Sequence, residues 1–313
     1  MAWRILRRLL IFLLSVVVAS IGVFWLLSGL GDPARIALGT SASEQGIAEL
    51  RGEMGLNRPL VSQYLAWAGG ALHGDFGMSF VNKTVIGDQL FDRLSVTLWL
   101  VAGAMVIALL IALPLGLLSA LWHRRSAGWI ISGITQLGVA VPAFLVGILA
   151  VALFAVKLRW LPSGGYVVPA TDPVGFLKSM VLPWCSLGLV QGAVLTRYVR
   201  SAVLDEMGQD YLRTARSKGL TPFQALLRHG IRNASIPVLT VLGVQLVTIL
   251  VGAVVIEQVF VIPGIGSWLV ESVGNQDILQ VQAIVMTLVA IALAVSFVID
   301  VLYTLIDPRL RQQ

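Results

Sequence analysis

The chain of 313 residues has one cysteine and few charged residues, and both shortages limit what it can be. Cys185 has no second cysteine to pair with, so the sequence excludes an internal disulfide and a cluster of thiolate metal ligands. We expect it to be a small core residue. Only 12% of the residues are charged, whereas 57% are apolar. Because so little polar surface cannot cover a soluble globule, the chain belongs in a lipid bilayer.

Catalytic signatures are missing as well. The sequence has no GxxxxGK[ST] phosphate-binding loop, since no lysine follows such a glycine pattern. The lysines are Lys83, Lys157, Lys178 and Lys218, and the histidines are His73, His123 and His229. All three histidines are predicted to lie in loops, which argues against an intramembrane hydrolase. We therefore predict no catalytic residue, no cofactor-binding residue, no metal site and no nucleic-acid partner in this chain.

Long apolar stretches, in contrast, are abundant. A helix needs about 20 apolar residues to cross a hydrocarbon core of about 30 Å. Six stretches qualify, and they cover residues 9–30, 96–121, 129–156, 180–199, 236–261 and 283–306. No alternating barrel pattern is present, so we predict an all-α integral membrane protein, with residues 1–313 forming a single domain of six transmembrane helices. Four prolines lie within or beside these spans, namely Pro114, Pro142, Pro183 and Pro237. We predict that they kink the helices and do not break them.

The distribution of basic residues predicts the orientation. The N-terminus, the 122–127 turn, the 197–233 loop and the C-terminal tail hold fourteen lysines and arginines, whereas the short outer connections hold three. Basic residues near span ends favour the cytoplasm, so both termini are expected there. The first span follows a basic start but is too long for a cleaved signal, and it is expected to remain as an anchor in contact with membrane lipid.

The large loop of residues 31–95 is then extracytoplasmic. Ser41 and Glu44 have the spacing of a capping box. A second helix is predicted to start at Pro59, a residue favoured at the first helical position. Its apolar side would hold Leu60, Tyr64, Leu65, Ala68 and Leu72. This side could lie on the membrane interface, the outer ends of the spans, an external partner or the chain's own bundle, and the sequence leaves these alternatives open.

The cytoplasmic loop of residues 204–233 is polar, basic and patterned. Steps of three and four join its first apolar positions, Leu204, Met207, Tyr211 and Ala215. This spacing predicts a helix with a narrow apolar stripe. Gly219 should end that helix, because glycine accepts left-handed backbone at low cost. Thr221 and Pro222 should start a second helix as its cap and first residue.

The second helix would place its own apolar residues on one side, namely Phe223, Leu226, Leu227 and Ile231. Two short helices joined tightly form a helix-turn-helix. A simple connector between spans does not need two amphipathic faces, a glycine stop and a capped restart. We interpret the loop as a rigid knob that fits a groove on another protein and transmits force.

Several segments together resemble a known family. They are GLNRPLVSQYLAW and GDFGMS in the outer loop, RLSVTLWL at the second span, DYLRTARSKGL and LLRHGIRNASIPVLT in the cytoplasmic loop, and VLYTLIDPRLR near the end. With them the chain resembles the membrane permeases of ATP-binding-cassette importers that use an extracytoplasmic binding protein, in particular the dipeptide and oligopeptide branch. The general loop motif opens Glu-Ala-Ala, whereas Arg213, Thr214 and Ala215 stand here, which looks like a mark of the peptide branch.

The resemblance implies a set of partners in the inner, or plasma, membrane of a bacterium. These are a second homologous permease in a heterodimer, two ATP-binding-cassette ATPase subunits and an extracytoplasmic peptide-binding protein. ATP and Mg would be bound by the ATPase subunits. The cytoplasmic loop would be the coupling loop that docks on them. The docking residues would be Asp210, Tyr211, Arg213, Thr214, Ala215, Arg216, Gly219, Leu220 and Thr221.

Polar residues within the spans are the candidates for a substrate route, because such groups rarely face lipid. The route would be lined by Thr135, Gln136, Gln191, Gln245 and Thr248, although bonding between helices is an alternative use for each. Dipeptides or short oligopeptides are the expected cargo, with nickel complexes, glutathione or another small solute as alternatives. A proton-coupled secondary transporter is a further alternative, but Glu257 and Asp300 lie towards opposite membrane faces and form no apparent relay.

Overall fold

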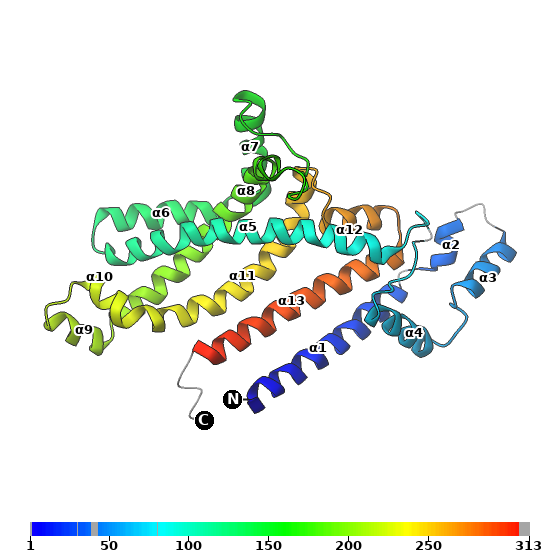
Figure 1. Cartoon of the computed structure of the whole chain (residues 1–313), viewed down its shortest axis with the longest axis horizontal. Helices are drawn as coiled ribbons and strands as arrows, with labels where there is room; N and C mark the ends of the chain where they lie inside the picture. The colour runs from blue at the N-terminus through cyan, green and yellow to red at the C-terminus, as the bar shows by residue number, and fades with distance from the viewer. Residues whose placement is uncertain (1, 30, 39–42, 80, 307–313) are drawn as a thin grey trace. The chain divides into compact units, whose positions relative to one another are not determined.

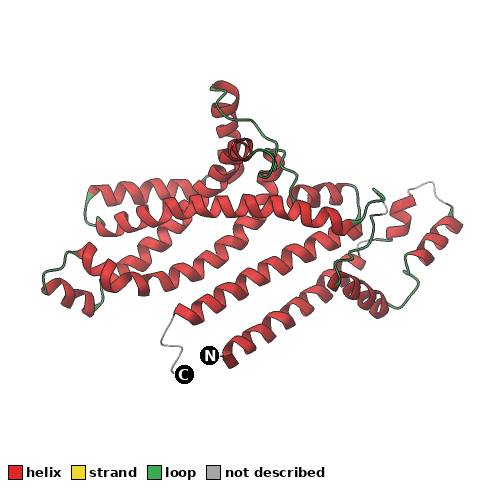
Figure 2. Ribbon diagram, viewed as in Figure 1, coloured by secondary structure: helices red, strands yellow, loops and turns green. Residues whose placement is uncertain are grey.

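The computed structural model describes residues 2–306 except 30, 39–42 and 80, and its regular elements are helices (Figures 1 and 2). An isolated bridge pairs Met78 with Val85. The chain forms two compact units. The first comprises Met1–Val96 and Gly264–Phe297, and the second comprises Thr97–Pro263 and Val298–Gln313.

Five helices in the described part of the chain are long and apolar enough to cross a bilayer, or up to six if a bent pair counts as one span. The five include α1 (Ala2–Ser28), α5 (Ile86–Leu121), α8 (Pro173–Met207), α11 (Ile231–Val259) and α13 (Ile278–Ile306). These helices confirm an all-helical membrane protein. Helix α8 extends beyond its predicted apolar stretch of residues 180–199 at both ends, because a helix can continue into the polar region on either side of a bilayer.

The third predicted span is wrong as a single kinked helix. It consists of α6 (Ser126–Ala140) and α7 (Ala143–Ala150), which continues as the π-helical η1 (Val151–Lys157), and the two arms are bent by 94°. Val141 has extended backbone, with φ −91° and ψ 124°. Pro142 lacks an N–H group and its ring disfavours helical backbone in the residue before it, so the helix stops here.

The other three prolines behave as predicted. Pro114 lies inside α5, Pro183 inside α8 and Pro237 inside α11, and each helix continues through the proline. Neighbouring helices and local adjustments can satisfy the carbonyl that a proline frees in a membrane helix. A proline alone therefore does not determine where a span breaks.

The first unit holds the shorter helices α2 (Pro33–Leu38), α3 (Glu44–Glu53), α4 (Leu60–Leu72) and α12 (Ile265–Gly274). Its core is a cluster of apolar side chains from Ile86, Leu90, Ile265, Trp268, Ala283 and Ile284. Ser41, the predicted cap of α3, lies outside the described residues. Ser43 caps this helix, and its Oγ accepts a hydrogen bond of 3.2 Å from the Gly46 N–H.

Helix α4 starts one residue later than predicted, with Pro59 as its N-cap. Its predicted apolar side is only partly correct. Tyr64 turns inward, and its ring lies 5.6 Å from that of Phe24 on α1, between centroids. Leu65 and Leu72 instead remain 63% and 87% exposed. One side of α4 thus packs on α1, while an apolar side is left without a partner within the described chain.

The second unit is built around α8, which packs against α6, α7 and α11. Small residues let the helices approach closely, as is typical of membrane proteins. A Cβ atom added to Gly188 of α8 would lie 2.6 Å from Ile107 of α5. The buried Thr97 hydroxyl donates a 2.6 Å hydrogen bond to Glu257, whose side chain is fully enclosed. Glu257 is therefore bonded within the helix bundle and not exposed to lipid.

Candidate functional site

The loop of residues 204–233 starts in the last turn of α8, which ends at Met207, and α9 (Asp210–Ser217) follows after a short break. The predicted stripe that joined residues 204 to 215 therefore crosses a helix boundary and is wrong as one helix. Tyr211 is 41% exposed, whereas Leu212 and Ala215 are buried. Gly208 interrupts the helix and resets the side that faces inward.

The turn after α9 forms as the sequence predicts. Gly219 has a φ of 97°, in the left-handed region that favours glycine. Just before it, the Lys218 N–H donates to the carbonyls of Thr214 and Ala215, both at 3.2 Å. Ser217 is the last helical residue, so the glycine stands just past the helix end, where this residue is most common.

The capped restart is also present. The Thr221 Oγ1 accepts from the Gln224 N–H at 3.3 Å, and the Gln224 Oε1 accepts from the Thr221 N–H at 3.1 Å. This reciprocal pair is a capping box. Pro222 follows as the first residue of α10 (Pro222–Ala225), where its missing N–H group costs nothing.

The restarted helix is not a separate short helix, which corrects the prediction. Helix α10 runs into the π-helical η2 (Leu226–Gly230) and from there directly into α11, without a gap. His229 lies in η2 and is therefore helical, not in a loop. Because turn and span form one continuous helical body, a displacement of Thr221 can reach the membrane part of α11 without crossing a flexible joint.

Buried apolar residues hold the loop against the helix ends. The cluster consists of Ala120, Val199, Ala202, Val203, Leu212, Ala215, Ala225, Leu226, Ala234 and Val238. Gly230 lies in close contact with this cluster, since an added Cβ atom would lie 2.9 Å from Leu226 and 3.1 Å from Leu212. Helix α9 is thus seated on η2 by close packing, which makes the loop a compact body.

A polar bracket ties the three helices together at the surface. Tyr211 on α9 donates a hydrogen bond to the Glu206 carboxylate on α8. Asn233 on α11 donates from Nδ2 to Glu206 at 3.3 Å and to the Tyr211 hydroxyl at 3.1 Å. Sequence analysis missed Glu206 and Asn233, because residues 22 to 27 positions apart give no local signal. Tyr211 therefore braces the loop in addition to any contact with a partner.

The remaining predicted docking residues divide into two groups. Those that face solvent are Asp210, Arg213, Thr214, Arg216, Gly219 and Thr221. Ala215 is buried in the cluster and Leu220 packs against it, so these two shape the loop from inside. Arg213 and Asp210 form an ion pair of 3.4 Å whose side chains are largely exposed. The outward surface is polar and mixed in charge.

The capping box allows a direct test of the turn. Replacing Thr221 by alanine removes the side-chain acceptor for the Gln224 N–H, and loss of such a cap costs about 1 kcal/mol. We expect faster amide hydrogen exchange in residues 222–230, measured by mass spectrometry, with little change elsewhere in the chain. Serine at the same position keeps the hydroxyl and should restore protection. Equal exchange in the alanine and serine variants would contradict the role of the cap.

The predicted route residues all lie in the second unit, but their environments differ. Thr135 is buried and donates to the carbonyls of Ile131 and Ser132, both at 3.0 Å. Gln136 and Thr248 are exposed. The side-chain oxygens of Gln191 and Gln245 are buried without a hydrogen-bond partner in the described structure. These two amides have unused bonding capacity and fit a polar route better than Thr135 does.

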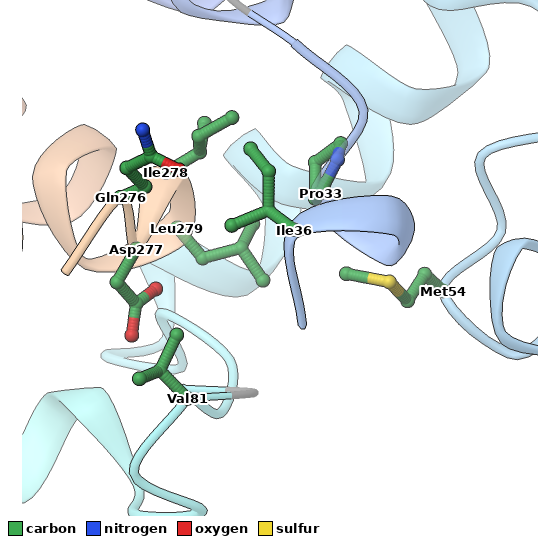
Figure 3. A pocket seen from close by; sticks show the side chains of 8 residues that line it. All are labelled: Pro33, Ile36, Met54, Val81, Gln276, Asp277, Ile278 and Leu279. Atoms are coloured by element: carbon green, nitrogen blue, oxygen red, sulfur yellow. The ribbon is translucent and has the colours of Figure 1, made fainter. Parts of the chain in front are cut away.

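The first unit contains two cavities. One is lined by Ile36, Met54, Val81 and Asp277 among others, and Figure 3 shows the Asp277 carboxylate at its side. Its volume of about 10 Å³ holds no more than one water molecule. The other has a volume of about 270 Å³ and is lined by Phe24, Trp67 and Gln282 among others. No group of metal-binding side chains occurs within the described residues.

Comparison with known proteins identifies relatives along the whole chain. Residues 112–312 match the family of binding-protein-dependent transport system inner membrane components, and residues 1–101 match the N-terminal family of such membrane components. A glutathione transport system permease protein of Escherichia coli is 35% identical over 308 residues, which cover 98% of each chain. A Brucella abortus permease protein, provisionally named for a peptide transport system, is 39% identical over 284 residues, or 90% of each chain.

A structural relative is also found. The crystal structure of an amino acid ABC transporter with histidines aligns with 72% of this chain and 94% of its own, at 17% sequence identity and a TM-score of 0.48.

Proposed function

Because the chain belongs to the family of binding-protein-dependent transport system inner membrane components, we propose that it forms half of a translocation pathway for dipeptides or short oligopeptides. As a member of this family it is a multi-pass protein of the bacterial inner membrane and the permease subunit of an ABC importer. ATP-binding-cassette subunits and a substrate-binding protein are its partners by family.

Residues 204–233 are proposed to be the coupling loop. The observation that carries this assignment is the unbroken helical path from Pro222 through η2 into α11. Helix α9 is seated on this path by the buried Leu212, and Gly219 sets the turn between them. A partner that pushes on the exposed residues of α9 would therefore move the membrane helix as well.

The direction of transmission follows from these connections. Closure of the two ATPase subunits would displace the docked loop, and α8 and α11 would tilt with it because both join the loop directly. Tilting of these helices would expose the route alternately to either side of the membrane. The ATPases can shift the equilibrium between the inward-open and outward-open states only if they contact the two states differently. The docking residues must therefore make different contacts with the ATPases in each state.

Two observations support a peptide substrate, namely the names of the relatives and the polar amide side chains in the membrane helices. The relatives are named for glutathione, itself a small peptide, and for peptides. Gln191 and Gln245 offer neutral amide groups, which can bond to a peptide backbone without selecting side chains. Choice among peptides would then be left to the binding protein. We propose that this permease pairs with a second homologous permease in a heterodimer.

The proposed orientation places both termini in the cytoplasm and residues 31–95 outside. We further propose that ATP and Mg are bound by the ATPase partners, and that this chain binds no cofactor of its own. Under this arrangement the loop of residues 204–233 lies on the same side as the ATPases, whereas the large outer loop lies on the side of the binding protein.

Uptake by the reconstituted complex tests the function. Proteoliposomes that contain both permeases and the ATPases should accumulate a labelled dipeptide when the binding protein is outside and ATP is supplied to the ATPases. Uptake should survive a proton uncoupler and stop when ATP is depleted. Excess unlabelled tripeptide should compete, whereas a nickel chelate should not. Sensitivity to the uncoupler alone would indicate a secondary transporter, and competition by the nickel chelate alone would indicate a different cargo.

A further inference from the structure

Helix α4 of the outer loop combines a long uncharged sequence with an unpartnered apolar side. No charged residue or histidine occurs from Pro59 to Leu72, whereas Arg58 and His73 flank this stretch. Val61, Leu65 and Leu72 are 70%, 63% and 87% exposed. Their spacing of four and seven residues places them on one side of the helix. Such a surface would be costly in water and calls for an apolar environment.

A neighbouring side of α4 is fixed to the first transmembrane helix. The Tyr64 hydroxyl shares a hydrogen bond of 2.8 Å with the Ser20 hydroxyl on α1. Phe24 of α1 contacts two aromatic rings of α4, with centroids 5.6 Å from Tyr64 and 5.9 Å from Trp67. These contacts lie within the first unit, and Figure 1 shows α4 beside the end of α1 that is far from the N-terminus.

The contacts on α1 fix the depth of α4. The last basic residue at the inner end of α1 is Arg8, and a helix rises about 1.5 Å per residue. Ser20 and Phe24 are therefore about 18 Å and 24 Å above Arg8 along the helix axis. A hydrocarbon core of about 30 Å that begins near Arg8 reaches past both residues. Tyr64 thus lies about 6 to 12 Å below the outer boundary of the core.

We propose that α4 lies embedded in the outer leaflet of the membrane, with Val61, Leu65 and Leu72 in contact with lipid. The depth agrees with that of interfacial helices, whose apolar side enters the headgroup and acyl boundary by about 5 to 10 Å. Tyr64 and Trp67 are the residue types that gather at membrane interfaces. At this depth the exposed side chains of α4 lie at the level of the acyl chains, so lipid, and not the binding protein, is its occupant. This inference rests on the proposed outward orientation of residues 31–95.

Spin-label accessibility tests the depth. Single cysteines are introduced in a Cys185→Ser background, labelled, and reconstituted as the full transporter in nanodiscs of phosphatidylethanolamine and phosphatidylglycerol. The label in Leu65→Cys should be accessible to oxygen and shielded from a water-soluble nickel chelate, as in Val18→Cys, a lipid-facing reference on α1 that is 60% exposed. The label in Glu49→Cys, at an exposed position of α3, should show the reverse.

Two results would overturn the inference. One is access of the nickel chelate to the Leu65→Cys label equal to that at Glu49→Cys, and the other is shielding that arises only when the binding protein is added. The orientation is tested separately, because a membrane-impermeant thiol reagent should label Glu49→Cys in intact spheroplasts. Labelling only after lysis would overturn the proposed topology and, with it, the assignment of α4 to the outer leaflet.

Discussion

Replacing Gly219 by valine should abolish substrate uptake, even though the chain still folds and inserts. Gly219 has a φ of 97°, which a β-branched residue adopts only with strain of about 1–3 kcal/mol. This strain lowers the equilibrium ratio of native to non-native turn by roughly five- to 150-fold. An added Cβ atom would meet nothing within 4 Å, so the effect comes from the backbone and not from a clash. Uptake by the reconstituted complex, together with its ATPase rate, measures the loss.

Two variants serve as controls for the Gly219 prediction. Asparagine tolerates left-handed backbone better than other residues with a Cβ atom, so Gly219→Asn should keep much of the uptake. An added Cβ atom at Gly133 of α6 would meet nothing within 4 Å, so Gly133→Ala should leave uptake unchanged. Normal uptake in Gly219→Val would count against residues 204–233 as the coupling loop. ATP hydrolysis without uptake would locate the defect in transmission and not in assembly of the complex.

Replacing Gly103 by alanine should destabilise the second unit. The new Cβ atom would fall on the indole ring of Trp184, far inside van der Waals contact. Trp184 would have to turn away and lose the 3.0 Å hydrogen bond from its Nε1 to the Trp99 carbonyl. It would also leave Phe176, whose ring centroid lies 5.7 Å away. Overpacking of this kind costs about 1–3 kcal/mol or more.

The melting temperature of the purified permease in detergent measures the Gly103 effect, with tryptophan fluorescence as the signal. A decrease in melting temperature and a change in the near-ultraviolet circular dichroism of the indoles are expected. Gly133→Ala on α6 is the matched control, because its Cβ atom would meet nothing within 4 Å. That variant should melt at the same temperature or slightly higher, since alanine favours helix over glycine. Equal stability of both variants would contradict the close contact between α5 and α8.

The transmembrane helices could be predicted because each apolar stretch is a property of consecutive residues. The helix ends were less predictable, since α5 starts at Ile86, ten residues before the apolar stretch begins. Its first turns are held by burial of Ile86 and Leu90 against Trp268, a contact between residues far apart in sequence. Hydropathy indicates which residues can lie in the bilayer, whereas tertiary packing decides where the helix begins.

The break at Pro142 shows the same division between local and distant causes. Four prolines carry the same local signal, yet three of them lie inside continuous helices. Helix α7 is placed by distant contacts, since a Cβ atom on Gly147 would lie 3.0 Å from Phe260 and 3.4 Å from Ser186. Sequence analysis could identify the four prolines as sites where a helix can bend, but not the one at which tertiary packing breaks the helix.

In the loop of residues 204–233, the turn was predictable and its bracing was not. Gly219 and Thr221 act on neighbouring residues, so their positions alone indicate a stop and a capped restart. The bracket of Glu206, Tyr211 and Asn233 depends on the fold bringing three helix ends together. The inward position of Leu212 followed from the break at Gly208, which shifts the helical phase in a way that periodicity does not detect.

The right-angled turn between α6 and α7 limits what can surround it. Helix α6 has 15 residues, and its length of about 22 Å falls short of the about 30 Å thickness of the hydrocarbon core. Around Val141 and Pro142 the helical ladder is interrupted, so peptide groups there need partners that acyl chains cannot supply. This elbow must therefore rest against protein or hydrated space. Among the described helices, it is the stretch that acyl chains alone could not surround.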